Sequence, residues 1–406
     1  MDVNRTGIHI KPNNARVLFR PFEPASKERF LRTIARVMTL SEAQTEALLA
    51  EVLREFGDRH HEIQRFFLHR FEQVQEHLLT DQPLSLPRQL LIGSYFTQEY
   101  SLESAALFNP SMVWHPDQSD LPDGARRFIL SLRATGEGHI SSIVFRSGVI
   151  TGTGQIRIED PGRYVTPPDQ VPNAQYDKPM FIRKLFELGT SGRFCDYVMA
   201  GLGDLFTLTE LEQAVKRVQR QERASQQDHS TAAKFILTLA RANYEVSYAP
   251  EQALSERVIF PTGPTETNGI EDARFVRFTY DDGHVCYYAP YTAYDGRVIL
   301  PQMLKTEDFL RFHVSTLNGP EVRNKGFALF PRSINGLYAM LSRQDNENIY
   351  LMYSDNLAFW YTKELVAKPT FSWEYVQLGN CGSPIETHAG WLVLTHGVGP
   401  MRKYAM

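Results

Sequence analysis

Pairs of short β-strand patterns recur through the last third of this 406-residue chain, and this recurrence restricts the fold more than any other feature. The pairs start near residues 275, 337 and 391, and the turn Asp281-Asp282-Gly283 joins the first pair. We expect Trp391 to His396 to form one strand of the third pair. Four-stranded propeller blades repeat about every 40–50 residues, so the observed spacings of 62 and 54 positions are a little long for blades. They still fit a mainly β chain built as a propeller whose longer loops lie at one rim and carry function. A sandwich of irregular hairpins stays open as the alternative.

Two stretches interrupt the β pattern with apolar residues at helical spacing. We therefore predict an N-terminal helical region, residues 1–87, and a β domain, residues 88–406, with a helical insertion at about 176–243. Within the first region, Ser41 and Gln44 have the spacing of a capping box, which predicts a helix start. The N-terminal helices are a candidate surface for a homo-oligomer.

The N-terminal region also carries His60, His61 and His69. No carboxylate or Cys completes a ligand set at a suitable spacing, so we interpret these histidines as a solvated helix face and expect no metal.

Composition narrows the functional classes. Hydrophobic residues make up 42% of the chain and charged residues 22%, as in an ordinary globular protein. The net charge of -4 gives no reason to expect a nucleic-acid or membrane partner. Three widely spaced Cys residues fit a reducing compartment without disulfides. With no secretory leader and no membrane-length apolar run in sight, we expect a cytoplasmic protein without a bound cofactor.

Charged residues gather where the strand patterns begin and end. Asn268 to Arg274 leads straight into a strand and places Glu271 beside Asp272. A neighbouring like charge makes one carboxyl group of such a pair a plausible general acid. Because adjacent strand residues point to opposite faces, we expect these two not to share a proton. A cap or an ion pair with Arg274 is an equally good role for Asp272.

Later strands add cations and possible sugar contacts. Lys325, Arg343 and His396 could together bind an anion, although Lys325 also fits a solvated loop. Tyr291 and Asp295 lie in a tyrosine-rich strand, where aromatic faces and a carboxylate would suit a sugar and would equally suit a sheet core. Further charged candidates follow or begin later strands: Asp345 and Glu386. Asn109 reads as a ligand-facing amide or as a turn residue.

Four motifs occur in order along the chain: Gly269-Ile-Glu-Asp-Ala-Arg274, Tyr291-Thr-Ala-Tyr-Asp-Gly296, Ala328-Leu-Phe-Pro-Arg332 with Ile334-Asn-Gly336, and Gly382-Ser-Pro-Ile-Glu-Thr387 with Gly390-Trp-Leu392 and His396-Gly-Val398. Together they resemble glycoside hydrolase family 130, the β-mannoside phosphorylases and β-mannosidases. The resemblance covers about residues 90–406 apart from the helical insertion.

This resemblance implies a five-bladed β-propeller that cleaves a terminal β-mannoside with inversion. The expected substrate is a β-linked manno-oligosaccharide or mannosyl disaccharide, and phosphorolysis would use inorganic phosphate and release mannose 1-phosphate. Asp272 falls on the catalytic acid, and Lys325, Arg343 and His396 fall in the phosphate-binding pocket. The candidate substrate-binding residues are Asn109, Arg146, Glu271, Arg274, Tyr291, Asp295, Asp345 and Glu386.

The chain also departs from the family pattern. Ala273 stands where a proline usually follows the acid, and Glu386 stands where many phosphorylases have a lysine. A carboxylate at position 386 would repel phosphate and could activate water, so a β-mannosidase is the alternative to the phosphorylase. A non-catalytic sugar-binding propeller is a second alternative. The sequence stops before the partner strand of the third pair, so we expect the propeller to lack a closing blade.

Overall fold

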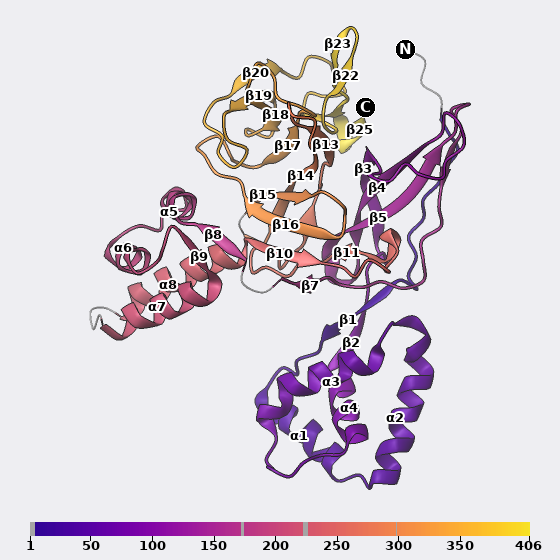
Figure 1. Ribbon diagram of the computed structural model, residues 1–406, viewed down its shortest axis with the longest axis vertical. Coiled ribbons are helices and arrows are strands. Elements are labelled where there is room, and N and C mark those ends of the chain that lie inside the picture. Colours follow the sequence, from indigo (N-terminus) through magenta and orange to yellow (C-terminus); the bar gives the residue numbers. More distant parts are fainter. Residues whose placement is uncertain (1–4, 172–173, 222–225, 298) are drawn as a thin grey trace.

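The computed structural model describes residues 5–171, 174–221, 226–297 and 299–406. Over these residues the fold is mainly β, and the helices form two groups that lie apart from the large sheets (Figure 1). The N-terminal group contains α1 (Lys27–Met38), α2 (Glu42–Phe56), α3 (Ile63–Val74) and α4 (Leu86–Tyr95). The second group contains α5 (Lys178–Glu187), α6 (Arg193–Ala200), α7 (Leu208–Gln221) and α8 (Gln226–Arg241).

Helix α2 begins where the sequence signal predicts. Ser41 caps α2, and its side chain and that of Gln44 form the reciprocal hydrogen bonds of a capping box, which confirms that prediction. The solvated-face interpretation is wrong for His60. That ring is buried, stacks on Phe19 with centroids 3.5 Å apart, and lies 2.7 Å from Glu99 Oε1. The cause is a tertiary contact, because the strand that carries Phe19 precedes the helices in the chain and packs against them.

Four larger sheets make up the β part. The first sheet contains β3 (Ala106–Trp114), β4 (Arg126–Thr135), β5 (Ser141–Ile150), β6 (Ile156–Ile158) and β11 (Val258–Ile259). The second contains β7 (Asp169–Gln170), β10 (Tyr244–Ser247), β12 (Ile270–Glu271), β13 (Val276–Thr279), β14 (Val285–Tyr294), β15 (Ile299–Thr306) and β16 (Arg311–Thr316). The third contains β17 (Lys325–Leu329), β18 (Tyr338–Arg343), β19 (Ile349–Ser354) and β20 (Glu364–Ala367). The fourth contains β21 (Gln377–Asn380), β24 (Thr395–Val398) and β25 (Tyr404–Ala405).

Three two-stranded ribbons complete the described β structure. They are β1 (Val17–Pro21) with β2 (Thr97–Ser101), β8 (Gln175–Asp177) with β9 (Leu205–Thr207), and β22 (Ile385–Thr387) with β23 (Gly390–Leu392).

The hairpin predictions are confirmed for two of the three pairs. β13 pairs with β14 across the turn Asp281-Asp282-Gly283, and β18 pairs with β19. The third prediction is wrong, because Trp391 to His396 is not one strand. Trp391 pairs with Glu386 in the β22–β23 ribbon, whereas His396 pairs with Gly379 in the fourth sheet. The chain changes partner between Leu392 and Thr395, which sequence alternation alone does not reveal.

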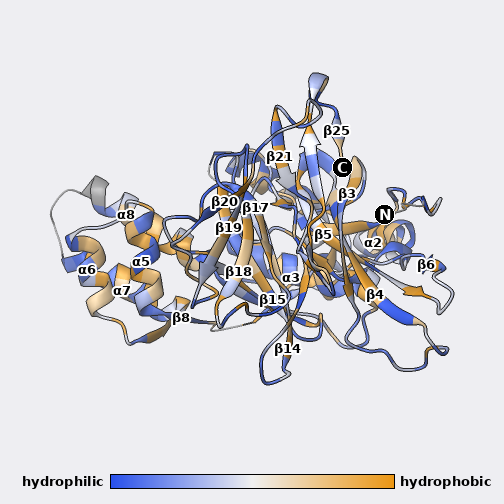
Figure 2. Cartoon of the chain, turned by 90° about the horizontal axis from the view of Figure 1, so that it is seen from above, coloured by the Kyte–Doolittle hydropathy of each residue, from blue (hydrophilic) through white to orange (hydrophobic). Residues whose placement is uncertain are grey.

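The four sheets follow one another in space and meet at their edge strands. β13 contacts β3, β14 contacts β17, and β17 contacts β21. β3, β17 and β21 are edge strands, and β12 with β13 forms the edge beside β14. In Figure 2, which views the molecule from above, β3, β17 and β21 lie near one another. Residues on four edges are therefore brought towards one region.

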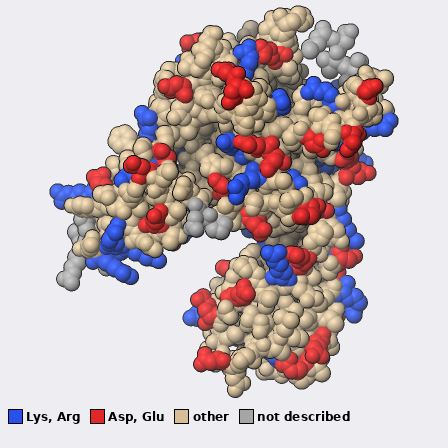
Figure 3. Space-filling view, in the orientation of Figure 1, with Lys and Arg blue, Asp and Glu red and all other residues tan. Residues whose placement is uncertain are grey.

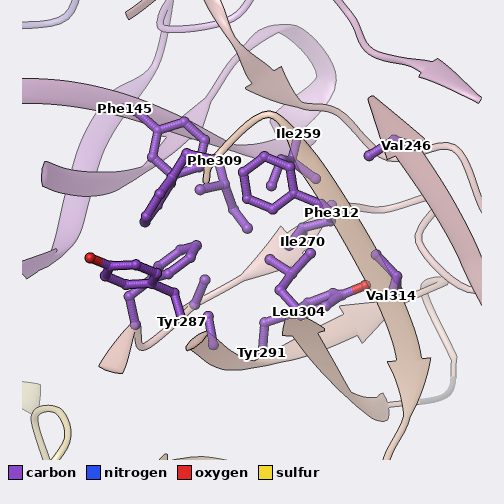
Figure 4. Packing of buried hydrophobic residues seen from close by; sticks show 14 of the residues in the cluster. Phe145, Val246, Ile259, Ile270, Tyr287, Tyr291, Leu304, Phe309, Phe312 and Val314 are labelled. Atoms are coloured by element: carbon purple, nitrogen blue, oxygen red, sulfur yellow. The ribbon is translucent and has the colours of Figure 1, made fainter. Parts of the chain in front are cut away.

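The largest apolar core lies between the first and second sheets. Figure 4 shows Phe145 from the first sheet packed against Phe312 of β16 and against Phe309 in the turn between β15 and β16. Phe145 and Phe312 are fully buried. At about 25 cal/mol per Å² of apolar surface removed from water, aromatic packing of this kind fixes the two sheets firmly against each other.

Helices α5 to α8 have a separate core. Val198, Leu211, Ile236 and Ala240 are fully buried in it and contact other residues of the same segment. Lys184 attaches the segment to the rest of the chain by donating to the Leu317 carbonyl at 2.7 Å. Among the described helices, none is long and apolar enough to cross a bilayer.

Candidate active site

Asp272 lies where the edge of the second sheet is interrupted. β12 ends at Glu271, Asp272 takes a left-handed backbone conformation with φ 55°, and pairing to β14 resumes at Val276. Asp is one of the few non-glycine residues that adopt this conformation readily. Gly269 precedes it at φ 121°, and a Cβ there would lie 2.6 Å from the Ser141 nitrogen, so only glycine fits.

This interruption overturns the strand-alternation argument for Glu271 and Asp272. Both carboxylates contact one guanidinium, because Arg133 donates to Glu271 Oε1 at 2.9 Å and to Asp272 Oδ1 at 3.2 Å. The alternation rule fails because the strand ends at Glu271 and the next residue has positive φ. All three side chains are about one-fifth exposed, so they lie at an open surface.

Asn109 reaches the same carboxylate from the first sheet. Its Nδ2 donates to Asp272 Oδ1 at 2.7 Å. Asn109 has φ 53° and lies in a β-bulge of β3, between Phe108 and Ser111. A bulge bends an edge strand and redirects a side chain, so the local irregularities at positions 109 and 272 bring the two side chains together.

Sequence reasoning missed Arg133. Its guanidinium carbon also lies 4.9 Å from the centre of the Phe108 ring, which holds it over β3. The only sequence signal was an arginine that follows the apolar run Phe128 to Leu132.

Two buried arginines, Arg274 and Arg343, interact with Asp272. Arg274 is 9% exposed, and burial together with nearby Arg343 lowers its pKa to about 10, although Asp272 opposes the change. Arg274 therefore stays charged at neutral pH. Arg343 is also buried, and Asp272 partly offsets the lowering of its pKa by desolvation. Both arginines therefore interact electrostatically with the Asp272 carboxylate.

His396 stands beside Arg343, with its Nε2 3.4 Å from Arg343 Nη1. Burial first, and then Arg343 and Arg274, lower the pKa of His396 to about 4. The ring is therefore neutral at physiological pH. Lys325 begins β17 directly opposite Arg343 in the β17–β18 register and is partly exposed.

Gly379 leaves space for the side chains of Arg343 and His396. A Cβ on Gly379 would lie 2.5 Å from Arg343 Nη1 and 2.6 Å from His396 Cε1. Asn380, next along β21, is fully buried, and neither atom of its amide group has a hydrogen-bond partner among the described residues. Sequence reasoning did not select Asn380, and no motif signalled it.

The structure does not bring Arg146 or Tyr291 to this region. Arg146 is 1% exposed and donates to Glu103 Oε1 at 2.8 Å, and Arg16 donates to the same oxygen at 3.0 Å. Tyr291 belongs to the apolar core shown in Figure 4. Its hydroxyl lies 2.6 Å from Glu266 Oε1, and burial raises its pKa. Both side chains are thus engaged in internal contacts.

The remaining candidates lie in turns or ribbons with local contacts. Asp345 accepts hydrogen bonds from the Glu347 and Asn348 backbone and from the Tyr350 hydroxyl, and these bonds lower its pKa to about 2. Asp295 accepts from the backbone nitrogen of Arg297 at 2.8 Å.

Glu386 is bound by Arg332 on an exposed ribbon, with Nε donating to Oε2 at 2.9 Å. This pairing lowers the Glu386 pKa. Among the described residues, no group of three or more His, Cys, Asp or Glu side chains could hold a metal ion.

The assembled site combines the Asp272 carboxylate with cationic and neutral groups from all four larger sheets. Such a set can protonate a leaving group on one side and bind an oxyanion on the other. These are the elements that inverting cleavage of a glycosidic bond by phosphate requires.

Comparison with known proteins agrees with this class of site. Residues 223–405 match the model of glycoside hydrolase family 130, described as beta-1,4-mannooligosaccharide phosphorylase. The resemblance predicted from the four motifs is therefore confirmed over residues 223–405, where this chain is similar to family 130.

Individual relatives have related names. A 1,2-beta-oligomannan phosphorylase of Thermoanaerobacter sp. is 32% identical over 43% of this chain and 58% of its own length. A beta-1,2-mannobiose phosphorylase of Listeria innocua is 28% identical over 36% of this chain and 42% of its own length. The chain thus matches between about two-fifths and three-fifths of the length of these relatives. A solved Listeria innocua beta-1,2-mannobiose phosphorylase in complex with beta-1,2-mannobiose aligns with TM-score 0.37 and 17% identity, over 76% of this chain and 71% of that one.

Proposed function

We propose that this protein cleaves terminal β-mannosides by phosphorolysis, with inversion, and releases mannose 1-phosphate. The observation that carries the proposal is the set of charges around Asp272: Arg133 donates to its Oδ1, and Arg274 and Arg343 interact with it electrostatically. The names of the relatives support a β-mannoside as the substrate class. For the fold, we propose that the four sheets are blades of a five-bladed β-propeller, which fits their serial contacts through edge strands.

Asp272 is the proposed general acid. Its Oδ1 accepts from Asn109 and Arg133, whereas Oδ2 has no hydrogen-bond partner among the described residues. A protonated carboxyl group carries its proton on the oxygen that is not already accepting from charged donors. Oδ2 is therefore the atom that would give the proton to the leaving oxygen, directly or through a sugar hydroxyl.

Lys325, Arg343 and His396 form the proposed phosphate subsite. Phosphate is already anionic, so it needs no general base but needs donors that offset its charge and align it. Arg343 and Lys325 supply the charge. His396 is neutral at pH 7 because its pKa is about 4, so it serves as a hydrogen-bonding group. Inorganic phosphate, which the cytoplasm supplies, is then the co-substrate, and no other cofactor is proposed.

The sugar subsite is proposed to include Glu271, Asn109 and Arg274. Glu271 and Arg133 offer paired acceptor and donor groups beside the acid, which suit vicinal hydroxyls. Arg146 and Tyr291 are not part of this proposal, because their polar atoms are engaged in buried contacts.

Phosphorolysis is favoured over hydrolysis by the state of Glu386. A water-activating base must be free to accept a proton. Glu386 is instead paired with Arg332, and the pairing lowers its pKa, which weakens it as a base. The pairing also offsets the negative charge that would otherwise repel phosphate.

Product analysis tests the proposal. The full chain is incubated with β-1,4- and β-1,2-linked manno-oligosaccharides, with and without inorganic phosphate. Mannose 1-phosphate that forms only with phosphate supports phosphorolysis. Free mannose at equal rates in both conditions would establish hydrolysis, and binding without any product would establish a sugar-binding protein.

A further inference from the structure

The segment α5–α8 forms a hollow with the third sheet. The hollow has a volume of about 610 Å³ and is lined by Arg183 of α5 together with Pro320, Asp355, Asn356, Phe359 and Tyr361. This volume lies within the range of roughly 300–1,000 Å³ that is usual for ligand pockets. The lining comes from α5 on one side and from the loops of the third sheet on the other. Specific contacts hold each side in place.

On the helix side, two contacts fix α5. Lys184 donates to the Leu317 carbonyl, and Glu187 Oε1 accepts from the Gly319 nitrogen at 2.9 Å. The Arg183 guanidinium carbon lies 3.7 Å from the centre of the Phe359 ring. Arginine stacked on an aromatic face keeps its N–H groups directed outward along the ring plane.

On the sheet side, the loop after β19 is held by Asn318 and Trp360. Asn318 Nδ2 donates to the Ala358 carbonyl at 3.0 Å, and the Trp360 nitrogen donates to the Asn318 carbonyl at 2.8 Å. Trp360 is fully buried. A loop held in this way loses little entropy on binding a ligand.

The polar groups of the hollow are not paired with one another. Within the described residues, the Arg183 guanidinium, the Asp355 carboxylate and the Tyr361 hydroxyl make no ion pair and no hydrogen bond. Phe359 and Tyr361 lie with ring centroids 5.9 Å apart at 29°, which gives the hollow an aromatic side. An anion would be repelled by Asp355 and a cation by Arg183. A neutral ligand with many hydroxyls satisfies both charges and packs its C–H faces on the rings.

The hollow is remote from Asp272 and its neighbours. Ser354, directly before the loop, pairs with Tyr338 at one end of β18, and Arg343 lies at the other end. At about 3.4 Å per residue, these ends are roughly 17 Å apart. The hollow therefore lies beyond the reach of the sugar rings that contact Asp272 directly.

We propose that this hollow is a second carbohydrate-binding site that holds a β-mannan chain away from the reacting end. The carbohydrate class follows from the chemistry of the hollow, and the choice of a mannosyl chain rests on the proposed function. An accessory site of this kind raises the local concentration of substrate without taking part in the reaction.

Affinity electrophoresis of the full chain through gels with soluble β-1,4-mannan tests this site, with dextran as the control polysaccharide. We expect mannan to retard the protein and Tyr361→Ala to weaken that retardation at least tenfold. Asp355→Ala should act in the same direction. Tyr375→Ala is the matched control, because Tyr375 is 66% exposed and lies outside the hollow, whereas Tyr361 is 45% exposed. Turnover of a mannosyl disaccharide should stay within twofold in all three variants.

Equal retardation of Tyr361→Ala and Tyr375→Ala, or stronger retardation by dextran than by mannan, would overturn the inference. The two proposals fail separately. If retardation depends on Tyr361 but no mannose 1-phosphate forms, the phosphorylase proposal is rejected and the second site is supported. If mannose 1-phosphate forms but retardation does not depend on Tyr361, the second site is rejected and the phosphorylase proposal is supported.

Discussion

Asn109 Nδ2 and Asp272 Oδ1 lie 2.7 Å apart, although 163 positions separate the two residues in the chain and they lie on the edges of different sheets. Both residues have left-handed backbones, with φ 53° and 55°. Two local departures from strand geometry therefore create one contact at the centre of the candidate site. Backbone strain of this kind persists where the surrounding structure holds it, and it clusters at functional sites.

Asp272→Asn should lower phosphorolysis by about 10³-fold, because the amide cannot donate the proton, and general acid catalysis contributes 10²–10⁴-fold. Substrate binding should change little, since the amide keeps the size and one acceptor oxygen. Rates of mannose 1-phosphate formation and affinity for a mannosyl disaccharide measure the two effects. A turnover rate for Asp272→Asn within fivefold of the wild-type rate would show that Asp272 is not the general acid.

Asn109→Gly and Asn109→Ala separate the side chain from the backbone. Both lose the hydrogen bond to Asp272, so we expect both to lower kcat by about 10–100-fold. Only alanine must also adopt φ 53° with a Cβ, which costs about 1 kcal/mol of unfolding free energy relative to glycine. Steady-state kinetics and urea unfolding test the pair. Full activity in the glycine variant would show that Asn109 does not position the acid.

Gly379→Ala should damage phosphate binding. The added Cβ would lie 2.5 Å from Arg343 Nη1, so the guanidinium must move. We expect KM for phosphate to rise at least tenfold, with a smaller change in KM for the sugar. Gly382→Ala is the matched control, because a Cβ there meets nothing within 4 Å. A similar KM for phosphate in both variants would argue against a phosphate subsite beside Arg343.

His396 should make stability depend on pH. Its folded-state pKa, about 4, lies below the ordinary value of 6.5, so the unfolded chain takes up the proton first as pH falls. The unfolding free energy should therefore decrease from pH 6.5 towards pH 4. In the His396→Gln variant, the unfolding free energy should decrease less between pH 7 and pH 5. Urea unfolding of both proteins at these two pH values measures the difference. Parallel curves for the two proteins would indicate an unshifted histidine.

Glu386→Gln distinguishes phosphorolysis from hydrolysis. The side chain is paired with Arg332 on an exposed ribbon, so phosphorolysis should stay within about threefold. If Glu386 activated water, its loss would reduce hydrolysis by about 10²-fold or more. The rates of mannose and mannose 1-phosphate release in each variant decide between these reactions.

Local chemistry made part of the fold predictable. The capping box at Ser41 and the turn Asp281-Asp282-Gly283 act over a few residues, so the sequence reveals them directly. The β22–β23 ribbon was not predictable in this way. Trp391 pairs with Glu386 rather than continuing to His396, and only the three-dimensional partners determine that choice.

Sequence motifs predicted part of the candidate site. Arg274, Arg343 and His396 stood out, and the structure gathers them near Asp272. Arg133 and Arg146 show where sequence reasoning stops. Each follows a short apolar run of a strand, yet Arg133 binds Asp272 and Arg146 binds buried Glu103. The difference depends on which sheet face each side chain meets, and no local pattern encodes it.

The ribbon of β1 and β2 has a consequence for any attempt to separate the helices from the sheets. Cutting the chain at residue 88 would discard β1 and expose the whole hydrogen-bonding edge of β2. It would also discard Arg16, which is fully buried and donates to Glu103 Oε1, the oxygen that also accepts from Arg146 of β5. The excised sheets would thus carry an open edge and a weakened internal ion cluster, and we expect them to aggregate rather than behave as an autonomous unit.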